Sequence, residues 1–201
     1  MVPPTILRCQ IRWHIVTIHA MTTSREAALF RVGIGHDTHR LAEGRPLILG
    51  GIHVEHARGL IGHSDADIVL HALTDALLGA AGLGDIGDQY PDSDPAWKDA
   101  DSCLFLRETV VRLNQAGWRV VNVDVIIFAQ EPKLGSIKAA IRANLAALLG
   151  LDADAVNVKA KTGERVGVIG RAEAMSCQVV ALISTGVRSQ ESGVRSQESA
   201  T

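Results

Sequence analysis

The spacing of hydrophobic and polar residues divides residues 31–184 into strands with a period of two and helices with a period near 3.6. RVGIGHD (31–37) alternates small and apolar residues, as a strand does. RPLILGGIHVEH (45–56) predicts two short strands joined at Gly50-Gly51, which is a hairpin signal. Three further strands are predicted at 119–130, 155–162 and 172–184.

Three segments have the apolar spacing of helices: 66–82, 100–117 and 135–150. The first is apolar almost all round, which predicts deep burial, and Ser64 or Asp65 is expected to cap it. Gly117 and Gly150 are expected to end the other two. The resulting order predicts an α+β fold, a mixed β-sheet with helices packed on one face.

The two ends of the chain differ from this region. Residues 1–30 look like an N-terminal extension, and Met21 would serve equally well as a start. Residues 185–201 contain a tandem heptapeptide, GVRSQES, whose polar composition predicts a disordered tail. A single domain is therefore expected at 31–184, a length that suits one core.

Composition narrows the functional class. A formal net charge of −2 predicts no bulk attraction to nucleic acid or to an anionic membrane, so an anionic ligand would need local cations, metals or backbone amides. The three cysteines lack CxxC spacing, which argues against a disulfide framework and favours a cytoplasmic protein. Neither a membrane span nor a signal peptide is expected. With aromatics at 3%, small aliphatic residues must fill the core.

The first chemical pattern joins a strand end to a helix. Asp37 and His39 lie two residues apart, so they point the same way from an extended chain, whereas His36 should face the opposite side. His71 lies inside the most apolar helix, where an unpartnered imidazole is costly. One carboxylate and two imidazoles would leave zinc an open fourth position. Ordinary hydrogen bonding of the two histidines is the alternative.

Four loops carry further polar groups. His63 and Ser64 precede the first helix, where free amides favour an anion, although Ser64 could be a simple cap. Asp85, Gly87 and Asp92 lie in a loop suited to binding polyol hydroxyls, or in a solvated turn.

Two later loops also carry charged groups. Lys133 follows a strand and could bind a phosphate or lie exposed on the surface. Glu164 and Arg171 lie in a segment suited to Mg²⁺ or Mn²⁺, or in a hairpin with exposed charges.

The order and identity of these motifs together are far more specific than any one motif alone. The chain resembles the 2-C-methyl-D-erythritol 2,4-cyclodiphosphate synthase family of the non-mevalonate isoprenoid pathway. The resemblance rests on DTH (37–39), HSDADIVLHALTDALLGAAGLGDIGDQYPDSDP (63–95), NVDVIIFAQEPKL (122–134) and NVKAKTGERVGVIGR (157–171).

The resemblance implies an enzyme, a phosphorus–oxygen lyase that assembles as a homotrimer with active sites between subunits. Its substrate would be a cytidine diphosphate derivative of methylerythritol phosphate, closed to a cyclic diphosphate with release of CMP. Asp37, His39 and His71 would hold Zn²⁺, and Glu164 would hold Mg²⁺ or Mn²⁺. The positions matching the erythritol phosphate site are His63, Ser64, Asp85, Gly87 and Asp92. Those matching the cytidine diphosphate pocket are Ala129, Lys133, Leu134, Ala160 and Thr162, and Arg171 matches a phosphate contact near the subunit interface.

The chemistry implied is an intramolecular attack of the 2-phosphate on the β-phosphorus. The nucleophile is already anionic, so catalysis needs positioning and charge neutralisation rather than a strong base, with His63 and the metal-binding residues as the catalytic set. Two other functions fit the metal motif: a zinc-dependent phosphatase, and a trimeric metal-binding protein without catalysis. Analysis of the product distinguishes all three.

Overall fold

The computed structural model describes residues 28–91 and 93–185, so the predictions for residues 1–27, Asp92 and 186–201 lie outside the described residues. Its centre is a five-stranded sheet in the order β4-β1-β7-β5-β6. β5 and β6 are parallel and the other pairs are antiparallel, so the sheet is mixed. The strands are β1 (Phe30–Glu43), β4 (Arg58–Leu60), β5 (Trp118–Phe128), β6 (Val156–Lys161) and β7 (Ala174–Thr185). A separate hairpin pairs β2 (Leu47–Leu49) with β3 (Ile52–Val54).

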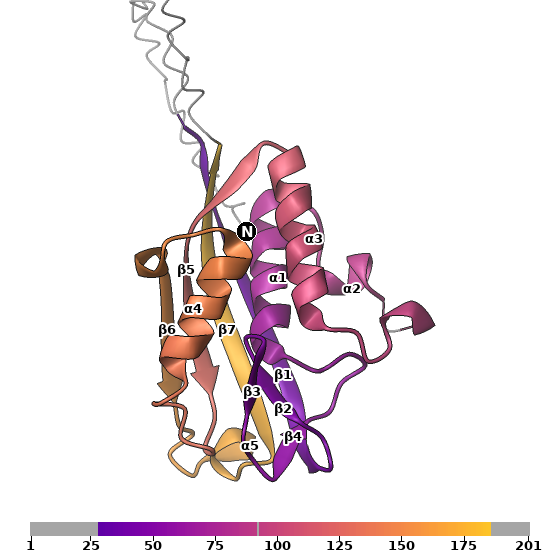
Figure 1. Cartoon of the computed structure of the whole chain (residues 1–201), viewed down its shortest axis with the longest axis vertical. Helices are drawn as coiled ribbons and strands as arrows, with labels where there is room; N and C mark the ends of the chain where they lie inside the picture. The colour runs from indigo at the N-terminus through magenta and orange to yellow at the C-terminus, as the bar shows by residue number, and fades with distance from the viewer. Residues whose placement is uncertain (1–27, 92, 186–201) are drawn as a thin grey trace, which may run out of the picture.

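Three helices form a second layer on one side of this sheet (Figure 1). They are α1 (Ile68–Ala81), α3 (Ser102–Gln115) and α4 (Lys138–Leu149). Shorter turns of helix are α2 (Ile86–Gln89), α5 (Gly167–Gly170), η1 (Pro95–Trp97) and η2 (Ala153–Ala155). The expected α+β class is confirmed, as are the three long helices, the hairpin at Gly50-Gly51 and the long strands.

The glycines of β1 explain how α1 lies so close to the sheet. A Cβ added to Gly35 would lie 1.9 Å from the carbonyl oxygen of Ala72, and one added to Gly33 would lie 1.9 Å from that of Ala76. Only glycine leaves room for the helix backbone at these two positions. The close approach brings the side chain of His71 next to Asp37 and His39, which lie in the middle of β1 and not at a strand end, because the strand continues to Glu43.

The core lies between the two layers. The inward row of the sheet that contains Gly35 continues through Val179, Val125 and Val158 on neighbouring strands, and these valines are buried. They pack with the apolar side chains of α1 and with Ile141 and other residues of α4. Aliphatic side chains dominate this core, as the low aromatic content predicts. In the described part of the chain, no helix has both the length and the apolarity needed to cross a membrane.

None of the helices in residues 28–91 and 93–185 covers the opposite face of the sheet. Val32 and Ile34 of β1 are 66% and 63% exposed, and Val180, which pairs with Ile34, is 43% exposed. They alternate along their strands with buried residues of the covered face. The sheet therefore has one face buried by helices and one face that presents apolar side chains outward.

Some details differ from the sequence predictions. Asp67, rather than Ser64 or Asp65, caps α1, because its buried carboxylate accepts the amides of Val69 and Leu70. The same carboxylate accepts the amides of Gly50 and Gly51, so the cap also holds the β2–β3 turn, a contact that the sequence does not reveal. Strand β4 and the short helices α2 and α5 were not expected.

Candidate active site

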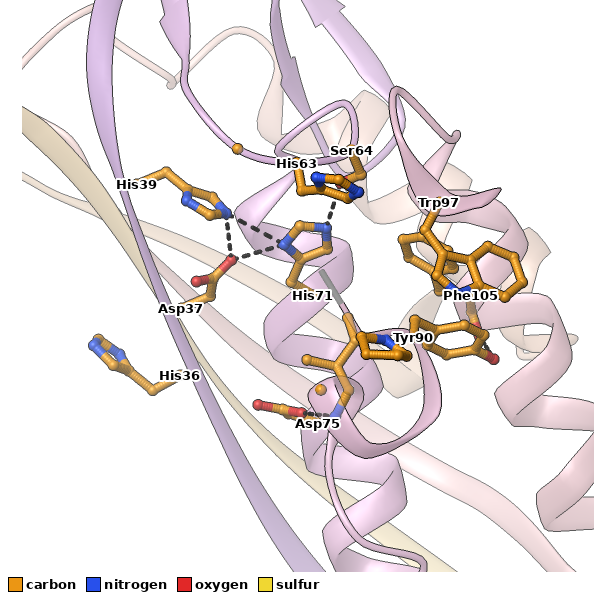
Figure 2. A pocket seen from close by; sticks show the side chains of 14 residues that line it. His36, Asp37, His39, His63, Ser64, His71, Asp75, Tyr90, Trp97 and Phe105 are labelled. Carbon is orange, nitrogen blue, oxygen red and sulfur yellow. Dashed lines mark hydrogen bonds and ion pairs between the residues drawn. The ribbon is translucent and has the colours of Figure 1, made fainter. Parts of the chain in front are cut away.

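Asp37, His39 and His71 converge where β1 passes α1 (Figure 2). His71 Nδ1 lies 2.9 Å from Asp37 Oδ2, and His39 Nε2 lies 3.1 Å from the same oxygen. The two histidine nitrogens are 3.4 Å apart. This is the one cluster of three such ligands found among the described residues.

These separations fit a tetrahedral metal ion. Zinc bonds of about 2.0–2.1 Å to nitrogen and oxygen place two ligand atoms about 3.3 Å apart, close to the spacing seen here. The donor set of two imidazoles and one carboxylate suits zinc and leaves a position for a ligand or water. The geometry is consistent with a divalent metal ion, and the prediction that the three side chains meet is confirmed.

The charges of the cluster reinforce one another. Burial alone would raise the pKa of Asp37, but hydrogen bonds with His39 and His71 outweigh burial and hold that pKa far below its usual range. Burial acts to lower the pKa of His71, yet the hydrogen bond and the charge of Asp37 raise it overall. An ionised carboxylate facing two imidazoles is an arrangement that readily exchanges protons for a metal cation.

His36 lies on the other side of the strand, as its position in β1 predicts. Its side chain is exposed, and its Nε2 lies 3.1 Å from the hydroxyl of Thr38, which belongs to the same outward row. Figure 2 shows the ring directed away from the three converging side chains. His36 is therefore separate from the metal-ligand cluster.

The second nitrogen of His71 meets two serines. Its Nε2 lies 3.0 Å from Ser64 Oγ and 2.9 Å from Ser102 Oγ. Ser102 Oγ donates in turn to Asp65, and Ser102 is fully buried. Sequence reasoning missed Ser102 and Asp65 in this setting, because residues 37 positions apart give no local signal of their contact.

A cavity of about 400 Å³ opens beside the cluster. Among the residues predicted to contact the erythritol phosphate, His63, Ser64 and Gly87 line it. Asp75, four residues after His71, also lines it and accepts the amide of Ile86 at 2.7 Å, which ties α1 to the α2 turn. Burial raises the pKa of Asp75.

Asp85 does not line this cavity but holds the turn that does. Its carboxylate accepts the amide of Asp88 at 2.9 Å, and Asp88 accepts the amide of Asp85 at 3.3 Å, forming a capping box for α2. The segment is therefore a turn ordered by its own hydrogen bonds, and not a loose solvated loop.

The start of α1 differs from the prediction of an anion site with free amides. The carboxylate of Asp67 already accepts hydrogen bonds from the amides of Val69 and Leu70, so these two amides are not free for an anion.

Aromatic residues form another wall of the cavity. Tyr90 stacks on Phe105 with ring centroids 4.5 Å apart, and Trp97 meets Phe105 edge-on at 5.7 Å. The hydroxyl of Tyr90 donates to Glu108 at 3.1 Å, away from the metal-ligand cluster. No local pattern in the sequence predicts that these three rings pack against one another.

The five residues predicted for the cytidine diphosphate pocket also lie together. Ala129, Lys133, Leu134, Ala160 and Thr162 line a second cavity of about 280 Å³. Two further lysines, Lys138 and Lys161, line the same cavity. The five positions therefore share one pocket, as predicted. Their role in binding a nucleotide stays a prediction.

Glu164 and Arg171 belong to the segment between β6 and β7. The hydroxyl of Thr162 donates to Glu164 at 2.5 Å, and the guanidinium of Arg171 pairs with Glu173 at 2.7 Å. A short helix, α5, occupies this segment, so the alternative of a simple hairpin is wrong. Neither side chain lines the cavity of about 400 Å³ beside the metal-ligand cluster.

Comparison with known proteins identifies the family. A model of the YgbB family matches residues 30–184, which is most of the chain. The chain belongs to the YgbB family. It is 57% identical over 155 residues to 2-C-methyl-D-erythritol 2,4-cyclodiphosphate synthase of Bordetella avium, covering 77% of this chain and 96% of that protein.

Solved structures agree with this YgbB assignment. The chain superposes on IspF of Plasmodium falciparum in complex with CDP with a TM-score of 0.67 and 34% identity, covering 77% of this chain and 95% of that one. It also superposes on the bifunctional IspDF of Campylobacter jejuni with a TM-score of 0.77 and 41% identity, covering 80% of this chain and 44% of that longer protein. The resemblance drawn from the sequence is confirmed. The chain is a cyclodiphosphate synthase, an enzyme of isoprenoid biosynthesis.

Proposed function

We propose that this chain closes 4-diphosphocytidyl-2-C-methyl-D-erythritol 2-phosphate into 2-C-methyl-D-erythritol 2,4-cyclodiphosphate. An oxygen of the 2-phosphate attacks the β-phosphorus, a new phosphorus–oxygen bond forms, and the bond from the β-phosphorus to the oxygen of the leaving CMP breaks. The observation that carries this proposal is the convergence of Asp37, His39 and His71 beside a cavity lined by His63 and Ser64.

The three converging side chains would hold Zn²⁺. When bound there, zinc supplies a Lewis acid that neutralises and orients a phosphate oxygen. The protein's own contribution is positional: β1 and α1 fix the ligands, and the α2 turn closes the cavity near the reacting phosphates. Holding both ends of a flexible substrate can lower the barrier of a ring closure by about 7–11 kcal/mol.

His63 is the strongest candidate for a direct phosphate contact. Its Nε2 is buried and has no hydrogen-bond partner within the described part of the chain, although the residue lines the cavity. A buried imidazole nitrogen without a partner is costly, and an anionic oxygen would satisfy it. Ser64 lies beside it and is expected to contribute its hydroxyl, with Asp85, Gly87 and Asp92 shaping the erythritol side.

The smaller cavity would receive the cytidine diphosphate. The Plasmodium falciparum relative has been solved with CDP, which supports a cytidine nucleotide as part of the substrate. Lys133 supplies positive charge there, and Ala129, Leu134, Ala160 and Thr162 supply the walls. Glu164 would hold Mg²⁺ or Mn²⁺, a hard cation that favours carboxylate and phosphate oxygens. Arg171 is proposed as a phosphate contact near a subunit boundary.

The working unit is proposed to be a homotrimer with its sites between subunits. The sheet face opposite the helices exposes Val32, Ile34 and Val180, and burying such a face in an interface removes apolar surface from water. The two cavities share no lining residue in one chain, as expected if a neighbouring copy completes each site. We also propose a cytoplasmic location, in keeping with three cysteines that lack paired spacing.

The test is to incubate the protein with the cytidylyl substrate and Mg²⁺ and to measure CMP and cyclic diphosphate by mass spectrometry. We expect both products in equal amounts, and none after zinc is removed by a chelator. A linear phosphate in place of the cyclic product would indicate a phosphatase. Retained zinc without CMP release would indicate a metal-binding protein that does not catalyse this reaction.

Two substitutions assign the roles of the metals. His71→Ala should lose zinc and turnover together, whereas His53→Ala, which removes an exposed histidine of β3, should lose neither. Glu164→Gln should weaken the dependence of turnover on Mg²⁺ or Mn²⁺ with zinc content unchanged. Full turnover of His71→Ala without zinc would contradict the ligand assignment, and an unchanged Mg²⁺ dependence would contradict the role of Glu164.

A further inference from the structure

The imidazole of His71 is held from both sides. Its Nδ1 faces Asp37 and His39, and its Nε2 faces the hydroxyls of Ser64 and Ser102. A nitrogen that binds a metal must present a lone pair, so the proton of the neutral ring must lie on the other nitrogen. An acceptor beside Nε2 that holds the proton there therefore leaves Nδ1 with a free lone pair for the metal.

We propose that Ser102, itself held by Asp65, is a positioning residue that fixes the proton of His71 on Nε2 and orients Nδ1 toward the metal. Metal-binding histidines commonly donate their second N–H to a carboxylate or carbonyl. Here a serine hydroxyl stands between the imidazole and the carboxylate. The inference rests on the proposed metal site but does not depend on which reaction that site performs.

The direction of the hydrogen bonds follows from the carboxylate. An ionised Asp65 can only accept, so the hydroxyl hydrogen of Ser102 points to Asp65 Oδ1, and the Ser102 amide donates to Asp65 Oδ2 at 3.1 Å. The hydroxyl oxygen of Ser102 is then left with lone pairs. His71 Nε2, at 2.9 Å, must be the donor to that oxygen.

Ser64 is less well suited to fix the ring alone. Its hydroxyl oxygen lies 3.0 Å from His71 Nε2, but it also accepts the amide of Ala66 at 3.3 Å and lies 3.3 Å from Ser102 Oγ. Its own hydroxyl hydrogen is not committed to a carboxylate. Ser64 also lines the cavity and is proposed to contact phosphate, so its hydrogen bonds would change when substrate binds.

The fold secures Ser102 independently of substrate. Ser102 is the first residue of α3 and is fully buried. The loop before α1 is joined to the start of α3 by a backbone hydrogen bond from Asp65 to Ala100 at 3.1 Å. The partner of His71 is therefore set before metal or substrate arrives, which is the kind of preorganisation that strengthens binding.

The test compares Ser102→Ala with Thr109→Val, which removes another fully buried hydroxyl seven residues further along α3. Zinc affinity is measured by competition with a chromophoric chelator. Loss of a partner of a metal-binding histidine typically weakens metal binding 10–100-fold, and we expect a decrease of about that size for Ser102→Ala. Thr109→Val should bind zinc as the wild type does.

The position of the ring proton gives a second measurement, made without metal. In ¹⁵N-labelled wild-type protein, the NMR signals of His71 should show the proton on Nε2, protected from exchange with water. Ser102→Ala should show faster exchange or a mixture of the two tautomers. Asp65→Asn, which retains side-chain size, should also weaken zinc binding and should also speed exchange of the Nε2 proton. It replaces Ser102→Ala in the test if that variant does not fold.

Unchanged zinc affinity together with an unchanged Nε2 proton in Ser102→Ala would overturn the proposal and leave Ser64 as the partner. An equal loss of affinity in Thr109→Val would show a general effect of the packing of α3, and would also overturn it. If the wild-type chain bound no zinc, the proposed metal site would fail, while the NMR measurement would still decide the hydrogen-bond assignment.

Discussion

The two faces of the sheet are built from the same strands but meet different surroundings. In β1, Gly33, Gly35, Asp37 and His39 face the helices, whereas Val32, Ile34, His36 and Thr38 face outward. On the covered face, two glycines admit α1 and the next two residues of the row meet His71. On the open face, Val32 and Ile34 carry branched apolar side chains that none of the described helices covers. One row of β1 side chains thus positions the proposed metal ligands, and the other row presents an apolar surface on which another chain could pack.

The largest expected contrast is in metal binding. His39→Ala removes one of three ligands and should weaken zinc affinity by more than the roughly 100-fold that loss of a ligand's hydrogen-bond partner costs at most. Turnover should fall with it. Thr38→Ala, one residue earlier but on the open face, should retain zinc content measured by elemental analysis. Equal zinc loss in both variants would contradict the division of β1 into two rows.

The second contrast concerns the fit of α1 on β1. Gly35→Ala would place a Cβ 1.9 Å from a backbone oxygen of α1, which must move, so the free energy of unfolding should fall by about 3 kcal/mol or more. Gly79→Ala lies on the exposed side of the same helix with nothing within 4 Å of the new Cβ. It should raise the stability by about 0.5–1 kcal/mol through helix propensity. Urea unfolding measures both, and a tolerated Gly35→Ala would contradict the close approach.

The third contrast tests the open face. Ile34→Glu should prevent assembly, because a charge would have to be buried in the proposed interface. Sedimentation should report single chains instead of trimers, with unchanged circular dichroism. Val111→Glu changes an equally apolar residue of α3 that is 53% exposed, and should leave the trimer intact. A trimer that persists in Ile34→Glu would place the interface elsewhere.

The smallest expected effect is that of an ion pair on the open face. Asp124 accepts from Lys159 at 2.5 Å and from Asn157 at 2.9 Å; slight burial acts to raise its pKa, but these hydrogen bonds lower it overall. A carboxylate with a lowered pKa stabilises the fold above its unfolded pKa of about 4, and the gain is lost as pH falls through the folded pKa.

Because both side chains of this pair are more than a third exposed, solvent screens it. Asp124→Asn should therefore cost less than about 1 kcal/mol at pH 7, and this cost should shrink at an acidic pH below the lowered folded-state pKa of Asp124. Urea unfolding at the two pH values measures the difference. A cost that persisted at low pH would show that the ion pair is not its source.

Much of the local structure follows from short-range pattern. The long helices, the Gly50-Gly51 hairpin and the stop at Gly150 were predictable because periodicity and left-handed glycine conformations act within a few residues. The cap of α1 was not, because Asp67 is selected by amides of the distant β2–β3 turn as well as by its own helix. The family motifs supplied the site positions, and the structure showed which of them share a cavity.

The sequence alone determined that Asp37 and His39 leave β1 on one side, since a strand alternates its side chains. It also determined that α1 would be buried on nearly all sides. The meeting of His71 with these two residues was a prediction that the tertiary structure confirmed. Only the tertiary structure decided that Ser102 and Asp65 would lie behind His71, and that Val32 and Ile34 would be uncovered by the described helices. The physical reason is that local pattern fixes the direction of a side chain, whereas its partners are chosen by packing between segments distant in the chain.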